Sequence, residues 1–266
     1  MERKQFFHKR AIEGQPPATI AIRQVRFNTA PGRPGILFCG GFHSDMTGSK
    51  ASRLDDHLTD RQTNFTRFDY SGHGSSGGRF EDGTIGYWYD DCLAVFDTVT
   101  GGPQIVVGSS MGGWMAMLLA RDRPERISGL ILMAPAPDFP SDLIEPSLSP
   151  EHRHDLERRG QCDIASEYGD SAYPITRRFL DESRDHNLLG GAPIPVRGPV
   201  RILHGDADPD VPLSHGFLAA SVLQSEDLVV EVIKGGDHRL STERDLSHLC
   251  RRVDEMTDMV VNRPER

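Results

Sequence analysis

The feature that most constrains the fold is a serine flanked by glycines, set between an apolar run and a helical pattern. The apolar run covers residues 104–107, the sequence Gly-Ser-Ser-Met-Gly occupies residues 108–112, and apolar residues at helical spacing continue to residue 121. A buried strand that turns directly into a helix is typical of parallel sheets whose two faces are covered by helices. We therefore predict an α/β fold with a mostly parallel, twisted sheet and helices on both faces.

The rest of the chain repeats this alternation. Short runs rich in β-branched residues predict strands, and longer segments between them carry apolar residues at helical spacing. The predicted strands are residues 19–27, 35–39, 64–70, 104–109, 127–133, 200–204 and 228–233, and the predicted helices are 49–60, 84–99, 111–121 and 242–261. Because 266 residues suit one large domain, we expect a single domain over residues 1–266.

Residues 136–198 interrupt the alternation. Strand-like runs disappear there, and Pro, Asp, Arg and His become frequent. We expect one helix that begins after Ser149 as its N-cap and stops at Gly160, and a second that starts at residue 174 or 175 and ends at 184. Long structureless loops are uncommon inside compact domains, so we interpret the segment as an inserted helical cap rather than a disordered loop.

The serine at the centre of the glycine-flanked turn, Ser110, is a candidate nucleophile. A G-x-S-x-G sequence between a strand and a helix is the nucleophile elbow, in which a strained backbone projects the serine hydroxyl above the sheet. Side chains at Gly108 and Gly112 would collide with neighbouring backbone. A phosphate-binding loop is the alternative, but it would require Gly-Lys-Ser/Thr or G-x-G-x-x-G, and neither pattern occurs at this turn.

A serine nucleophile requires a general base, and His238 is placed to provide it, after the last predicted strand and a glycine pair. An acid must orient the histidine. The turn after the strand at 200–204 offers Asp206, Asp208 and Asp210, and the spacing His-Gly-x-x-Asp-x-x-Val-Pro favours Asp208. We interpret the other two aspartates as turn and capping residues. The order Ser, Asp, His along the chain is that of α/β hydrolases.

Two backbone N–H groups are expected to form an oxyanion hole. One is that of Met111, directly after the candidate nucleophile, and the other is that of Phe42, after the strand at 35–39. The ring of Phe42 either lines an acyl pocket or packs in the core. The nearby His43, Ser44 and Asp45 are candidates for a direct substrate contact. In the turn at 69–77, which we interpret as structural, His73 is a turn residue rather than a second base.

Composition and charge exclude several classes of protein. The chain has 30 Lys and Arg against 39 Asp and Glu, a net charge of −9, which argues against binding nucleic-acid phosphates. No stretch approaches the ~18 apolar residues of a transmembrane helix, and residues 1–10 lack the apolar run of a signal peptide. The four cysteines are scattered and suggest neither a disulfide framework nor a zinc site. We expect a cytoplasmic protein that needs no cofactor and no metal.

With these motifs in place, the chain resembles the α/β hydrolases over essentially its whole length. It is also similar to a narrower group, the mitochondrial palmitoyl-protein thioesterases and acyl-glucuronide esterases with an α/β-hydrolase domain. The matching stretches are residues 40–51, 67–76, 102–114, 193–196, 203–205 and 237–239. The resemblance implies hydrolysis of thioesters and activated esters, with the nucleophile, acid and base at Ser110, Asp208 and His238. The substrate would be a small-molecule ester or thioester, or an acylated protein.

The resemblance departs from the group at two points. The predicted cap, which would shape the acyl pocket, matches the group mainly at its end, so an acyl-protein (palmitoyl) thioesterase or acyl-glucuronide esterase activity is implied by the resemblance alone. The transit peptide of a mitochondrial protein has no counterpart in this sequence, which favours the cytoplasm. Two other functions stay open: C–C bond hydrolysis or cofactor-free perhydrolysis by the same three residues, and a non-catalytic receptor-like role on this fold, which usually accompanies loss of one of them.

Overall fold

Within the part of the chain that the structure describes, eight strands form one central sheet. The structure is a computed structural model that describes residues 1–11, 17–30, 32–165 and 172–262. The strand order is β1-β2-β4-β3-β5-β6-β10-β12, antiparallel from β1 to β4 and parallel from β4 to β12. The strands are β1 (Glu2–Arg10), β2 (Ala18–Arg26), β3 (Gly35–Cys39), β4 (Phe65–Phe68), β5 (Gln104–Ser109), β6 (Ile127–Met133), β10 (Val200–Gly205) and β12 (Leu228–Ile233).

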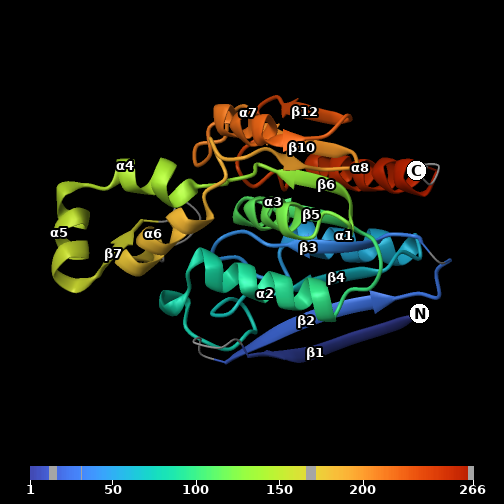
Figure 1. The fold of residues 1–266 in the computed structure, drawn as a ribbon, viewed down its shortest axis with the longest axis horizontal. Helices are drawn as coiled ribbons and strands as arrows, with labels where there is room; N and C mark the ends of the chain where they lie inside the picture. Colours follow the sequence, from blue (N-terminus) through green and yellow to red (C-terminus); the bar gives the residue numbers. More distant parts are fainter. Residues whose placement is uncertain (12–16, 31, 166–171, 263–266) are drawn as a thin grey trace.

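Helices cover both faces of this sheet (Figure 1). Helices α1 and α8 pack on one face, and α2, α3 and α7 pack on the other. Side chains of a strand alternate between the two faces of a sheet. In β3, Ile36 and Phe38 pack against α1 and α8, and Leu37 and Cys39 lie on the face that α2, α3 and α7 cover. The helices are α1 (Ser49–Asp60), α2 (Ile85–Thr98), α3 (Met111–Asp122), α7 (Leu213–Val222) and α8 (Glu243–Val261).

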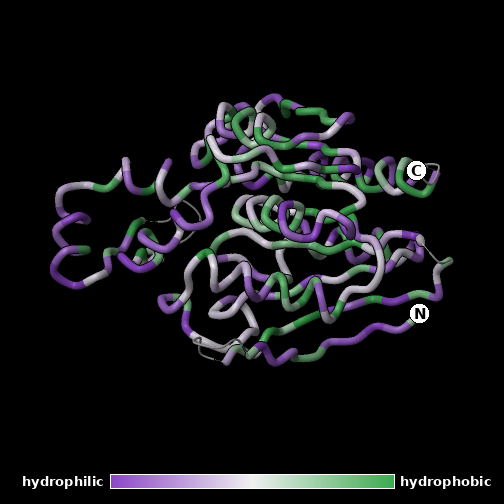
Figure 2. The backbone as a smooth tube through the Cα atoms, in the orientation of Figure 1, coloured by the Kyte–Doolittle hydropathy of each residue, from purple (hydrophilic) through white to green (hydrophobic). Residues whose placement is uncertain are grey.

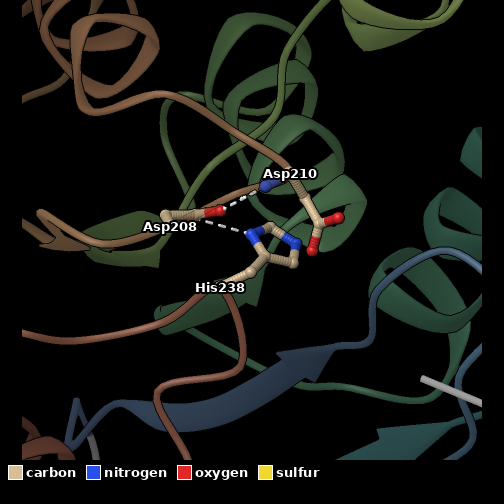
Figure 3. Close-up of side chains that lie close together, drawn as sticks. All are labelled: Asp208, Asp210 and His238. Carbon is tan, nitrogen blue, oxygen red and sulfur yellow. Dashed lines mark hydrogen bonds and ion pairs between the residues drawn. The ribbon is translucent and has the colours of Figure 1, made fainter. Parts of the chain in front are cut away.

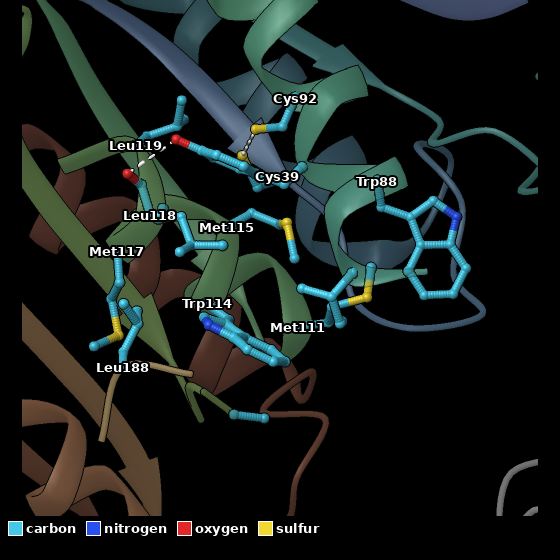
Figure 4. Close-up of a cluster of buried hydrophobic side chains, with 14 of the residues drawn as sticks. Cys39, Trp88, Cys92, Met111, Trp114, Met115, Met117, Leu118, Leu119 and Leu188 are labelled. Carbon is cyan, nitrogen blue, oxygen red and sulfur yellow. Dashed lines mark hydrogen bonds between the residues drawn. The ribbon is translucent and has the colours of Figure 1, made fainter. Parts of the chain in front are cut away.

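Helix α3 lies inside the core. Residues 111–120 are all buried, as expected of a helix that is packed on every side. Figure 4 shows the side chain of Trp114 among those of neighbouring elements, including Trp88 of α2 and Cys39 of β3. Ser110, directly before α3, is therefore carried by a helix that cannot shift without opening the core.

Hydropathy follows this layering. Figure 2 shows hydrophobic residues along the central strands and α3, whereas β1 and the outer part of the segment between β6 and β10 are hydrophilic. None of the helices in the described ranges has both the length and the apolar character needed to cross a bilayer.

Strand β1 lies outside the strands predicted from the sequence. Most of its side chains are exposed, so it has no apolar alternation that would mark it as a strand. Two ion pairs attach it to helices on opposite faces of the sheet. Arg3 lies 2.6 Å from Asp55 of α1, and Arg10 lies 2.5 Å from Asp91 of α2. These partners are distant in sequence, which is why local patterns do not reveal the strand.

The segment between β6 and β10 is not purely helical, so the expectation that residues 136–198 lack strands is wrong. The hairpin of β7 and β8 pairs antiparallel, and the residues assigned to the start of a second helix form β8 instead. That helix begins only after Thr176, whose hydroxyl caps it by accepting the N–H of Phe179. The elements are a π-helical turn (Pro140–Ile144), α4 (Glu145–Ser147), α5 (Pro150–Arg159), β7 (Gln161–Ile164), β8 (Tyr173–Thr176), α6 (Arg177–Ser183), a 3₁₀ turn (Arg184–His186) and β9 (Ile194–Pro195), which pairs with β11 (Leu223–Gln224).

Helix α5 has the ends that its sequence predicts. The Ser149 hydroxyl accepts the N–H of His152 at 3.1 Å, and Pro150 takes the first helical position, where no N–H is needed. Gly160 follows the last turn at a φ of 71°, the left-handed conformation that commonly ends helices. Local signals were therefore sufficient for this helix.

Candidate active site

Four loops meet at the carboxyl edge of the sheet. Ser110 lies between β5 and α3, Asp208 between β10 and α7, and His238 between β12 and α8. The fourth loop, residues 40–48, joins β3 to α1 and is called the β3–α1 loop below. Loops that follow parallel strands emerge at one edge, which is where open α/β sheets bind their ligands.

The backbone of Ser110 is strained. Its φ of 56° and ψ of −121° are uncommon for a residue other than glycine. The turn is held because the Ser110 N–H donates to the carbonyl of Met133 at 2.9 Å. A Cβ atom at Gly108 would overlap the carbonyl of Gly112, and one at Gly112 would overlap the carbonyl of Cys39. The two glycines are thus required by close backbone approach.

The structure brings Ser110, His238 and Asp208 into one line of hydrogen bonds. His238 Nε2 lies 2.9 Å from Ser110 Oγ, and His238 Nδ1 lies 2.8 Å from Asp208 Oδ2. With Nδ1–H donating to the carboxylate, Nε2 is left to accept the serine hydroxyl proton. The side chain of His238 is 14% exposed and that of Asp208 is 0% exposed, so the pair is shielded from water while the serine end stays reachable.

Asp208 is kept ionised by its surroundings. Burial by itself would raise the pKa of this carboxyl group, but hydrogen bonds from His204 and His238 and from the Val211 N–H hold the pKa well below its usual range. The Asp208 Oδ1 atom also accepts the N–H of Asp210 at 2.9 Å (Figure 3). It accepts the N–H of Val211 at 2.8 Å as well. The carboxylate is therefore fixed in place as well as in charge.

The two other aspartates of this turn have different surroundings. Asp206 pairs with Lys234 at 2.7 Å and accepts the N–H of Gly235, so it stabilises the turn. The Asp210 carboxylate lies on the other side of the His238 ring (Figure 3). Asp208, Asp210 and His238 are the single group of three metal-type ligands found among the described residues. Because the Nδ1–H of His238 already donates to Asp208, we do not interpret this group as a metal site.

The β3–α1 loop approaches the serine closely. A Cβ atom at Gly41 would lie 3.4 Å from Ser110 Cβ, and the next residue is Phe42. On the opposite side, Met111 is the first residue of α3, and N–H groups in the first turn of a helix lack an intrahelical acceptor. The oxyanion role of these two N–H groups stays a prediction.

The ring of Phe42 packs in an aromatic cluster and also lines a narrow crevice. It stacks on Phe179 at 5.5 Å between ring centres. Its other ring neighbours, all edge-on, are Phe80, Trp88, Phe139 and Tyr173. The crevice beside it is too narrow to hold a water molecule. The structure therefore shows that the ring packs in the core, and its role in lining an acyl pocket stays a prediction.

Comparison with known proteins identifies the family. The pattern of the serine aminopeptidase family, S33, matches residues 31–153. The chain is 39% identical to the mitochondrial palmitoyl-protein thioesterase ABHD10 of Mus musculus over 240 residues, which are 90% of this chain and 79% of the relative. A putative hydrolase from Agrobacterium vitis S4 superposes with a TM-score of 0.90 at 38% identity, over 97% of this chain and 100% of that chain. For the mouse α/β hydrolase domain-containing protein 10, the TM-score is 0.84 at 34% identity, over 96% and 99%.

The chain belongs to the α/β-hydrolase family. The predicted fold class and the predicted resemblance are thereby confirmed. The match to a family of hydrolases and the identity to relatives that are named thioesterases show that the protein is an enzyme, a serine hydrolase. The S33 pattern ends at residue 153 and so contains Ser110 but neither Asp208 nor His238. In this hydrolase, Asp208 and His238 are identified as site residues by their hydrogen bonds, which link them to Ser110.

The loop that carries His238 in this hydrolase is anchored by residues that sequence reasoning missed. Lys50, in the first turn of α1, donates a hydrogen bond to the carbonyl of Arg239. Burial lowers the pKa of Lys50 to about 8, assisted by Arg239 and opposed by Asp237. Leu240 is buried at a φ of 43°, and its N–H donates to the Asp237 carboxylate at 2.9 Å. The only sequence signal for Lys50 was its place in a stretch that matches the family.

The two ends of the segment between β6 and β10 are joined at Asp138. Its carboxylate accepts the N–H groups of Leu188 and Leu189 at 2.8 and 2.7 Å. Asp138 is 1% exposed, and its φ of 58° is uncommon for a residue with a side chain. Sequence patterns gave no signal for this residue, because its partners lie some 50 positions away.

The same segment also contacts the two helices that border the site. The Glu182 carboxylate accepts the N–H of Gly86, in the first turn of α2, at 2.9 Å. The indole N–H of Trp114 in α3 donates to the carbonyl of His186 at 3.2 Å. Helix α6 is therefore held against the elements on which Ser110 and the aromatic cluster depend.

Proposed function

We propose that this hydrolase cleaves carboxylic esters or thioesters through an acyl-enzyme on Ser110. The observation that carries the proposal is the unbroken line of hydrogen bonds from Ser110 Oγ through His238 to Asp208, with lengths of 2.9 and 2.8 Å. It is supported by the relative in mouse, which is named a palmitoyl-protein thioesterase. The proposed substrate is an acylated small molecule or an acylated protein.

In the proposed reaction, His238 Nε2 takes the hydroxyl proton as Ser110 Oγ attacks the acyl carbon. The carbonyl electron pair moves to oxygen, and its return expels the alcohol or thiol, which receives the proton from His238. Water then attacks the acyl-enzyme and gives a proton to His238 Nε2. The bond between the acyl carbon and Ser110 Oγ breaks, His238 returns the proton to Oγ, and the carboxylic acid leaves. Asp208 stays ionised and stabilises the imidazolium in both halves.

The N–H groups of Phe42 and Met111 are the proposed donors to the oxyanion. They flank Ser110, one on the β3–α1 loop and one at the start of α3. The N-terminal end of a helix also carries partial positive charge, which favours an anion there. Donors of this kind act because they are fixed before charge develops, and removing one typically costs ~10²–10³ in kcat.

Residues 136–198 are proposed to form a cap that limits the size of the acyl group. The support is their place in the aromatic cluster. Phe139 and Phe179 of this segment both contact the ring of Phe42, whose N–H is a proposed oxyanion donor. An acyl group that extends from Ser110 toward the Phe42 ring would therefore meet this segment.

We also propose a reducing, cytoplasmic location. It is supported by the four cysteines, which are all free thiols, and cell fractionation tests it.

The function is tested by turnover of graded p-nitrophenyl esters, acyl-CoA thioesters and acyl-cysteine thioesters. We expect hydrolysis that EDTA leaves unchanged and that Ser110→Ala abolishes. Ser109→Ala is the matched control, because the neighbouring serine ends β5 and makes no bond to His238 among those described. Activity retained in Ser110→Ala contradicts the proposal, as does a lack of turnover of every ester and thioester in the panel by an enzyme that hydrolyses a C–C bond in a 1,3-diketone substrate.

A further inference from the structure

The turn of residues 69–76, which follows β4, holds the β3–α1 loop from behind. One carboxylate oxygen of Asp69 accepts the N–H of Met46 at 2.6 Å. His73 Nε2 lies 3.2 Å from the backbone nitrogen of His43 and accepts its N–H. The turn therefore bonds the loop at two places, and the second lies one residue beyond the proposed oxyanion donor.

The imidazole of His73 is held in one orientation. Its Nδ1 lies 3.2 Å from the carbonyl oxygen of Ser71 and donates to it. The residue is 4% exposed, and the rings of Tyr70, Phe80 and Trp88 surround it edge-on. When Nδ1 is the donor of a neutral imidazole, Nε2 keeps a lone pair and acts as an acceptor.

The residue that receives this bond has a strained backbone. His43 has a φ of 55°, which residues other than glycine adopt rarely and keep only where their surroundings fix it. Because a peptide group is planar, fixing the N–H of His43 also fixes the peptide group that joins it to Phe42. The Phe42 N–H belongs to the preceding peptide group, and the carbonyl of that group, on Gly41, accepts the N–H of Ser44 at 3.3 Å. The two hydrogen bonds therefore fix the peptide groups on both sides of Phe42.

We infer that His73 is a positioning residue: its Nε2 lone pair fixes the peptide group that follows Phe42, which restricts rotation of the preceding peptide group, the one that carries the Phe42 N–H toward the oxyanion. The inference rests on the proposed function, because it assigns His73 a task only if the Phe42 N–H binds the oxyanion. The sequence identified His73 as a turn residue. The hydrogen bond from the His43 N–H to His73 connects that turn to the loop that carries the proposed oxyanion donor.

The protonation state of His73 agrees with this role. Burial lowers the pKa of His73 to about 4; the hydrogen bond to the Ser71 carbonyl opposes the shift and the nearby His43 assists it. The ring is therefore neutral at pH 7 and keeps its lone pair. Within the described residues, the titratable groups that face the ring are His43 of the loop and Tyr70 of the same turn. The other two rings around it do not titrate.

Two variants separate the two hydrogen bonds of His73. His73→Gln places an amide oxygen near the position of Nε2 and can still accept the His43 N–H. His73→Asn places its amide near Nδ1 and can still donate to Ser71, but it cannot reach His43. We expect His73→Asn to lower kcat by about 10- to 100-fold with KM changed less than about 3-fold, because a displaced oxyanion donor acts on the transition state. His73→Gln should stay within about 5-fold of wild type.

Rates are counted per active site, from the burst of p-nitrophenol, and melting temperatures are recorded alongside; His8→Asn on β1 controls for the substitution itself. The inference is overturned if His73→Asn turns over at the wild-type rate per titrated site, or if both variants lose activity equally. Failure of the proposed function looks different. The wild-type enzyme would then give no burst and no adduct on Ser110, and both proposals would fall together.

Discussion

Ser110, Asp208 and His238 each follow a strand of the parallel sheet, and this is why the sequence alone placed them at one edge. The glycine-flanked turn, the His-Gly-x-x-Asp spacing and the glycine pair before the histidine are local signals. The bond from His73 to His43 is not a local signal, because it joins two loops 30 positions apart. Its existence depends on how β3 and β4 pair, which no short pattern encodes.

Replacing Asp208 by Asn should reduce catalysis far more than stability. The amide keeps the shape but removes the charge that faces the His238 imidazolium, and in a serine protease triad this change costs ~10⁴ in kcat. We expect kcat on one ester to fall by about 10²- to 10⁴-fold. Asp206→Asn and Asp210→Asn should weaken the turn and lower the free energy of unfolding by about 1–2 kcal/mol, with kcat nearly unchanged. A collapse of kcat in Asp206→Asn, with kcat of Asp208→Asn near that of the wild type, would show that Asp206 and not Asp208 orients His238.

His73 should make stability depend on pH in a known direction. Its pKa is about 4 in the folded protein and ~6.5 in an unfolded chain. Between these values the unfolded state binds more protons, so the free energy of unfolding rises with pH from about 4 to about 6.5, by up to about 3 kcal/mol. His73→Gln lacks this contribution. In urea unfolding at several pH values, the free energy of unfolding of the wild type minus that of His73→Gln should grow as the pH rises. A difference that stays constant with pH would exclude a lowered pKa of His73.

At the scale of elements, strongly patterned segments were predictable and those that depend on distant partners were not. Helix α1 has the predicted bounds, and α5 has the predicted caps. Strand β1 depends on ion pairs to distant helices, and β8 depends on pairing with β7. Helix α7 was missed because it is short, contains Gly216, and has no Asp, Glu, Lys or Arg to define an outer face.

Lys50 should act through the loop that it anchors. Lys50→Met keeps the apolar stem but removes the donor to the Arg239 carbonyl. The His238 loop then loses one fixed contact, and we expect kcat to fall by about 3- to 10-fold with KM nearly unchanged. Lys9→Met on β1 is the matched control. Equal rates for the two variants would show that Lys50 does not position His238.

Helix α6 should affect which acyl groups are accepted. Phe179 stacks on the ring of Phe42, whereas its neighbour Leu180 lines a separate cavity of about 170 Å³ within the segment. Phe179→Leu should shift kcat/KM toward longer acyl chains in a series of p-nitrophenyl esters, relative to the shortest ester, with a stability cost below that of Phe→Ala, which is about 3–5 kcal/mol. Leu180→Met is the control. An unchanged ratio in Phe179→Leu would place the acyl pocket elsewhere.

At the scale of the whole molecule, the site needs both halves of the chain. The first half supplies the serine and the β3–α1 loop, the second supplies the acid and the base, and the segment between β6 and β10 spans the edge where they meet. The long-range pairing of β6 with β10 and of β10 with β12 brings the halves together. The proposed chemistry therefore depends on the complete sheet.

The most direct measurement is the mass of the enzyme during turnover. Mixing with a p-nitrophenyl ester and quenching in acid within the burst should trap a covalent adduct whose added mass equals the acyl group, and peptide mapping should place it on Ser110. His238→Ala should accumulate the adduct far more slowly. Steady turnover with an unmodified enzyme, or an acyl group found on another residue, would contradict the account.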